Sequence, residues 1–201
     1  MTILVSGVNG VHAMLLGDRR LTYADGRTED STQKSLILSV GGTIFVVGFT
    51  GVGMVGSTPT LRWLYETLIA IGQRERGAMS VLEHLAAAAS HDFARLRLTA
   101  PWARLTFAGV GFVIEDPSPR PILWRISNFQ VEAEPPTPRP LPQFVMGGAG
   151  GDLVNGRWEP IHRLDGSGAA IESQTLPPWR DFIDGLWDDA HPSKLAYDGL
   201  R

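Results

Sequence analysis

The sequence predicts an α+β fold in which helices cover one face of a mostly antiparallel sheet. Three observations indicate this class: two hairpin signals in the first fifty residues, two helical segments after residue 58, and strand-like sequence again at 103–114 and 121–131. Strands, then a helix pair, then further strands are typical of folds that segregate their helices on one side of a sheet. The chain is long enough for a substantial core, so we expect residues 1–201 to form a single domain.

The first hairpin signal is the dipeptide Asn9-Gly10 between two apolar runs. A type I′ turn needs positive φ at both central residues, which Asn and Gly tolerate. Counting outward from this turn pairs Leu4 with Leu15 and brings the amino-terminal end of the first strand close to Asp18.

The second hairpin signal is Gly41-Gly42, again between apolar runs. The same count pairs Val40 with Thr43 and brings Lys34 close to Gly48. Each hairpin therefore carries polar residues at its open end. If the two hairpins lie side by side in one sheet, these residues converge with Thr2 and Asp18.

Two helices are expected after the hairpins. Thr58 as N-cap and Pro59 at the first helical position begin a helix that extends to Gly72. The segment Ser80–Glu83 has the pattern of a capping box and begins a second helix, which Pro101 ends. The proline-rich stretch 132–142 is interpreted as an insertion or exposed loop between strands.

Composition excludes several classes of function. The net charge of −3 gives no electrostatic case for binding nucleic acid or an anionic membrane. No apolar run approaches the ~20 residues that cross a bilayer, and the amino terminus lacks the pattern of a signal peptide. Cysteine is absent, and the five histidines lack the spacing of a metal site, so we expect no metal and no cofactor. We expect a cytoplasmic protein.

The four converging residues can perform nucleophilic catalysis. Methionine aminopeptidases remove Met1 when the next side chain is small, which would leave Thr2 with a hydroxyl nucleophile and its own α-amine as base. A cation at Lys34 favours the neutral amine, and Asp18 can hold that lysine in place. Gly48 can offer a backbone N–H to a developing oxyanion. Each residue also has an ordinary structural interpretation: a start-site residue, a solvated strand end, or a glycine needed for packing.

The spacing of Thr2, Asp18, Arg20, Lys34 and Gly48 resembles that of the proteasome β-subunit and its bacterial relatives, which are N-terminal-nucleophile hydrolases. The resemblance covers about the first hundred residues. It implies a four-layer αββα sandwich, a peptide or small amide substrate, and a homo-oligomeric ring or stacked assembly; the sequence identifies no ATPase partner. It implies catalytic roles for Thr2, Asp18, Lys34 and Gly48, and substrate-binding roles for Arg20, Thr22, Phe49 and Thr50.

The second half of the chain departs from this family. Ala149 occupies the position where the family has a serine near the nucleophile, and Asp165 and Ser167 follow too soon for two long helices to precede them. An aromatic stripe at 179–187 is interpreted as core or as a subunit contact. Two alternatives to a threonine peptidase therefore stay open: a non-catalytic scaffold or binding subunit of the same kind, and a hydrolase of a small amide.

Overall fold

The structure is a computed structural model that describes residues 3–22, 28–95, 103–114, 119–130, 140–150, 153–154, 157–158 and 161–166. The chain divides into two compact units, residues 1–168 and 169–201, and every described residue belongs to the first. Pro101, the aromatic stripe at 179–187 and most of the stretch 132–142 lie outside the described residues. Residues 140–142 form neither helix nor strand.

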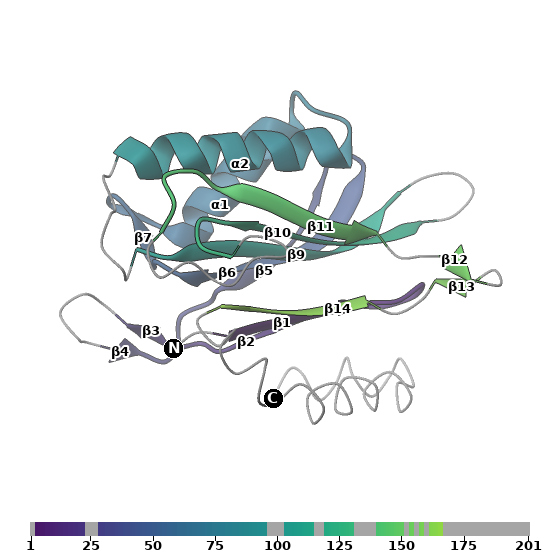
Figure 1. The fold of residues 1–201 in the computed structure, drawn as a ribbon, viewed down its shortest axis with the longest axis horizontal. Coiled ribbons are helices and arrows are strands. Elements are labelled where there is room, and N and C mark those ends of the chain that lie inside the picture. Colours follow the sequence, from purple (N-terminus) through teal and green to yellow (C-terminus); the bar gives the residue numbers. More distant parts are fainter. Residues whose placement is uncertain are drawn as a thin grey trace. The chain divides into compact units, whose positions relative to one another are not determined.

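Two larger antiparallel sheets and a helix pair form most of the described part (Figure 1). The larger sheet has the order β11-β10-β9-β6-β5, and the smaller has the order β14-β1-β2. The strands of the larger sheet are β5 (Ser35–Val40), β6 (Thr43–Gly51), β9 (Leu105–Val113), β10 (Arg120–Ser127) and β11 (Val145–Gly150). Those of the smaller sheet are β1 (Ile3–Val8), β2 (Ala13–Gly17) and β14 (Ile161–Gly166).

Three short strand pairs and the two helices complete the described elements. The pairs are β3 (Leu21–Thr22) with β4 (Thr28–Glu29), β7 (Met54–Val55) with β8 (Thr58–Pro59), and β12 (Leu153–Val154) with β13 (Arg157–Trp158). The helices are α1 (Thr60–Gly72) and α2 (Ala78–Arg95). α1 begins at Thr60, one residue after its predicted first position, and α2 begins at Ala78, two residues before Ser80. Pro59 is the N-cap of α1, and Ser80 lies inside α2, where its hydroxyl donates to the Glu75 carboxylate instead of capping the helix.

The β5–β6 hairpin confirms the predicted register. Val40 is opposite Thr43, and the two turn glycines, Gly41 and Gly42, have φ of 58° and 72°. Positive φ at both central positions is the type I′ geometry that fits the twist of the flanking strands.

The predicted register of the β1–β2 hairpin is wrong by two residues. Leu4 is opposite Gly17 instead of Leu15. The reason is the Asn9 side chain, whose Oδ1 accepts hydrogen bonds from the backbone of Val11 (2.8 Å) and His12 (2.7 Å). Asn9 therefore begins the turn instead of occupying its centre. A shift by an even number of residues leaves every side chain on its predicted face.

The helices cover one face of the five-stranded sheet. Core residues of the two layers form a single cluster, in which Phe45 and Trp124 pack edge to face with ring centroids 5.7 Å apart. The largest fully buried members from the helices are Leu64, Leu68, Leu82 and Leu85. Burial of this apolar surface is the main stabilising contribution expected for the unit.

The other face of the five-stranded sheet packs against the three-stranded sheet. Val8 of β1 forms a second, smaller cluster with Val110 and Leu123, and Ala13 and Leu15 of β2 pack against it. The two predicted hairpins therefore belong to two facing sheets, and the condition that they lie side by side in one sheet is not met. β1 has β14 as its other neighbour, and β6 has β9.

The predicted four-layer αββα sandwich is also wrong. The described residues are mostly strand, and their two helices lie on one face of a five-stranded antiparallel sheet. After β11, where the resemblance predicts long helices, the described chain continues as extended segments β12, β13 and β14. β14 then pairs with β1 along six residues, which satisfies backbone groups that would otherwise form a sheet edge.

A hydrogen bond between the two helices should make the stability of the fold depend on pH. Trp63 of α1 donates through Nε1 to Asp92 Oδ2 of α2 (2.9 Å), and His91 Nδ1 lies 3.0 Å from Asp92 Oδ1. Burial alone would raise the pKa of Asp92, but the hydrogen bonds from Trp63 and His91, with the charges of His91 and Arg95, together lower it. The ionised carboxylate is therefore favoured by the folded state.

Because the folded-state pKa of Asp92 is lowered, its contribution to stability is present above the unfolded carboxyl pKa of about 3.9 and is lost as the pH falls through the folded value. We expect Asp92→Asn to reduce the free energy of unfolding at pH 7 by at most about 1 kcal/mol, because the carboxylate is partly exposed. The difference from wild type should shrink between pH 5 and pH 3 in urea unfolding followed by tryptophan fluorescence. Glu66→Gln, which alters an exposed pair with Arg62 on α1, is the control. A pH-independent deficit in Asp92→Asn would contradict the prediction.

Candidate active site between the two sheets

A buried lysine lies where the two hairpins meet. Lys34 immediately precedes β5, and its side chain is only 4% exposed. Its Nζ donates to Asp18 Oδ1 at 3.0 Å and to the carbonyl oxygen of Arg20. Asp18 follows β2, so this ion pair joins the five-stranded sheet to the three-stranded sheet. Lysine is almost never fully buried without a charged partner, because its desolvation is costly.

Gly48 lies beside this lysine on β6. It is opposite Ser35 of β5, and the next N–H, that of Phe49, donates to the Lys34 carbonyl at 3.1 Å. A Cβ at Gly48 would lie 2.9 Å from Leu15 Cδ2 and 3.0 Å from the Lys34 carbonyl oxygen. Glycine is therefore required by the close approach of β2 and of the Lys34 backbone.

The interface between the two sheets changes from apolar to polar along the strands. Directly opposite residues in a ladder share a face, so the registers define rows of side chains. One row of the larger sheet, Val46, Val110 and Leu123, belongs to the apolar cluster around Val8. The next two rows toward Lys34 are Gly48, Ala108 and Arg125, then Thr50, Thr106 and Ser127. We call these two rows, with Asp165 of the smaller sheet, the polar end of the interface.

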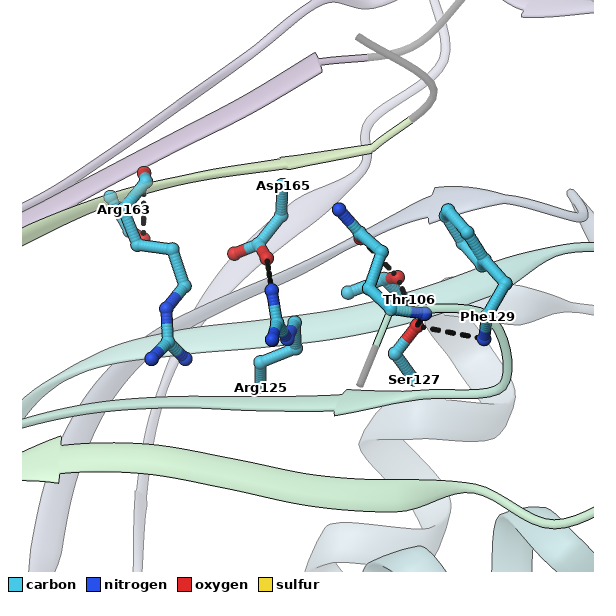
Figure 2. A network of polar contacts seen from close by, with 8 residues as sticks. Thr106, Arg125, Ser127, Phe129, Arg163 and Asp165 are labelled. Carbon is cyan, nitrogen blue, oxygen red and sulfur yellow. Dashed lines mark hydrogen bonds and ion pairs between the residues drawn. The ribbon is translucent and has the colours of Figure 1, made fainter. Parts of the chain in front are cut away.

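Polar side chains at this end bond to one another. Arg125 Nη1 of β10 lies 3.2 Å from Asp165 Oδ1 of β14, and Figure 2 shows the two side chains pointing toward each other across the interface. Thr106 Oγ1 lies 2.8 Å from Ser127 Oγ, which also accepts the N–H of Phe129. Sequence reasoning missed Arg125 and did not assign a role to Asp165. A charged residue within the alternating apolar strand 121–131 was the available signal.

The structure brings three of the predicted catalytic residues together: Asp18, Lys34 and Gly48. The fourth, Thr2, lies outside the described residues; in the sequence it precedes Ile3, the first residue of β1. β1 is the central strand of the smaller sheet, between the strand that leads to Asp18 and the strand that carries Asp165.

The four predicted substrate-binding residues lie in different surroundings. Thr50 is buried and shares the face of Gly48, at the polar end. Phe49 lies on the opposite face, in the core beneath the helices. Thr22 belongs to β3, opposite Thr28. Arg20 contributes its carbonyl to Lys34, while its exposed guanidinium pairs with Asp30 at 2.7 Å, and this hydrogen bond raises the pKa of Arg20 and lowers that of Asp30.

Metal chemistry has no candidate in the described part of the chain, where no group of three or more acidic or histidine side chains could hold an ion. Among the described helices, neither has the length and apolar character needed to span a bilayer.

Comparison with known proteins gives no family model, no curated protein and no solved structure that matches.

Proposed function

We propose that this protein is an N-terminal threonine amidohydrolase that uses Thr2 as its nucleophile after removal of Met1. The observation that carries the proposal is the buried Lys34 ammonium, held by Asp18 and the Arg20 carbonyl beside Gly48. Burying an ammonium group is costly even with a carboxylate partner, and apolar side chains fill the same interface one row away. This placement favours a chemical role for the lysine.

The proposed reaction uses two groups of one residue. Thr2 Oγ attacks the substrate carbonyl carbon while the Thr2 α-amine accepts the hydroxyl proton. The C–N bond of the tetrahedral intermediate then breaks, and the ammonium returns its proton to the departing amine. Water, activated by the same amine, hydrolyses the resulting ester and regenerates the hydroxyl.

The remaining residues act electrostatically in this proposal. A cation at Lys34 favours the neutral, basic form of a neighbouring amine, and Asp18 fixes its position. In this proposal the backbone N–H at Gly48 stabilises the developing oxyanion. We propose a peptide or small amide as substrate and a homo-oligomer in the cytoplasm as the working form.

Covalent labelling tests the nucleophile. An epoxyketone forms one bond to a threonine hydroxyl and one to the α-amine of the same residue, so it reports both groups together. We expect the intact mass of the native protein to lack Met1 and to increase by one probe on treatment. Thr2→Ala should not be labelled, and Thr2→Ser should be labelled more slowly.

Thr28→Ala is the matched control, since Thr28 is an exposed threonine of β4, and it should be labelled like the wild type. Retention of Met1, or equal labelling of Thr2→Ala, would refute the proposal. A processed chain that is never labelled would instead support the scaffold or binding-subunit alternative, for which Ala149 in place of the family's serine is the favouring observation.

A further inference from the structure

A second buried ion pair joins the two sheets at the polar end. Asp165 is completely buried and the Arg125 side chain is 11% exposed. Asp165 is directly opposite Leu4, and its neighbour Gly166 is opposite Ile3. The pair therefore connects the row that contains Gly48 to the strand that runs beside the start of β1 (Figure 2).

The two ion pairs lie on either side of β1. Lys34–Asp18 is formed on the side of β2, and Arg125–Asp165 is formed on the side of β14. In both pairs the cation belongs to the five-stranded sheet and the carboxylate to the three-stranded sheet. β1, which begins one residue after Thr2, is the central strand between them.

Stability alone gives a poor account of this arrangement. Replacing a buried ion pair by well-packed apolar residues is often neutral or stabilising. The same interface is apolar around Val8 and Val110, where no described charged pair is present. Among the described residues, the two ion pairs that cross the interface therefore lie at the end nearest the start of β1.

We infer that Arg125 is a positioning residue for the amino-terminal nucleophile, acting through the Asp165 carboxylate that it holds beside the start of β1. This inference rests on the proposed function. Arg125 fixes β14 to the five-stranded sheet and neutralises Asp165. An unbalanced carboxylate beside the start of β1 would favour the protonated form of the α-amine, which cannot act as a base.

The charged groups that face this end of the interface come from four elements or their ends. They are Lys34 before β5, Asp18 after β2, Arg125 on β10, and Asp165 and Arg163 on β14. Arg125 and Asp165 have opposite charges, so removing one or the other should change the basicity of the α-amine in opposite directions. A pair that does not act on the α-amine predicts no such opposition.

The test measures the pKa of the α-amine in chains that begin at Thr2, by competitive acylation with acetic anhydride across pH, together with the pH dependence of epoxyketone labelling. Arg125→Met should raise the pKa of the amine by on the order of one unit, and Asp165→Asn should lower it. Arg125→Lys, which keeps the charge, should stay close to the wild type. Arg62→Met, which removes an exposed cation from α1, is the control.

Equal or unchanged amine pKa values in folded Asp165→Asn and Arg125→Met chains would overturn the inference. If Arg125→Met does not fold, Asp165→Asn still decides it, because an amine pKa unchanged in Asp165→Asn contradicts the inference by itself. A labelled wild type whose variants keep its amine pKa refutes only the role of Arg125. A wild type that is never labelled refutes the proposed function and this inference with it.

Discussion

Replacing Lys34 by methionine is expected to reduce the rate of epoxyketone labelling by at least about 10³-fold. The substitution keeps an unbranched, flexible side chain that is one atom shorter, and it removes the charge. The α-amine of Thr2 would then lose the cation that favours its neutral form, and Asp18 would lose the partner that it holds at 3.0 Å. The second-order rate constant of labelling, measured by intact mass from pH 6 to pH 9, gives the size of the effect.

Lys34→Met should lose labelling while it keeps its fold. Asp18 is 33% exposed, so its carboxylate can regain water when Lys34 is removed, and methionine still fills the space of the lysine stem. We expect Lys34→Met to keep the wild-type far-ultraviolet circular dichroism and tryptophan emission. Arg62→Met tests for a general effect of removing a cation. Labelling of Lys34→Met at the wild-type rate would exclude an electrostatic role for this lysine.

The two hairpins show what turn sequences can and cannot predict. Gly41-Gly42 favours a single turn geometry, because both residues adopt positive φ at no steric cost. The strand register follows from that turn. Asn9-Gly10 is compatible with a second turn geometry. In this geometry the Asn side chain accepts two backbone hydrogen bonds, and the turn moves by one residue. Local sequence does not decide between these two.

The candidate site was nevertheless predicted in part, and for a physical reason. The register error in the first hairpin is even, so Leu4 and Leu15 stay on the face that meets the other sheet. Asp18 and Lys34 then meet across two facing sheets, whereas the convergence argued from the sequence assumed a single sheet. Alternation of side chains is a local property, whereas the assignment of hairpins to sheets depends on β9 and β14, which lie far along the chain.

The contact between Arg125 and Asp165, in contrast, could not be predicted from the sequence. Forty residues separate them, and neither belongs to a motif that specifies a partner. Their contact depends on β14 pairing with β1 and on the two sheets packing face to face. Such a contact cannot be derived from periodicity. An arginine within a strand that is otherwise buried on both faces indicates that a partner exists without identifying it.

Replacement of Gly111 by alanine is expected to destabilise the fold by more than about 3 kcal/mol. Gly111 lies on β9 opposite Phe45, at the centre of the five-stranded sheet. A Cβ there would overlap the carbonyl oxygen of Ile44, which belongs to the backbone of β6 and cannot rotate away as a side chain could. Relief of this overlap requires β6 and β9 to separate, and that movement would disturb the ladder that carries Gly48.

Gly77→Ala supplies a matched comparison, since a Cβ at Gly77, just before α2, would meet nothing within 4 Å. We expect this control to change the free energy of unfolding by no more than about 0.5 kcal/mol. Urea unfolding followed by tryptophan fluorescence should show a large decrease of the midpoint for Gly111→Ala and almost none for Gly77→Ala, with similar m-values. Equal midpoints for the two variants would mean that β6 and β9 are not packed as closely as the structure shows. The Gly48 row, with the Arg125 pair and the proposed site, would then lose its geometric basis.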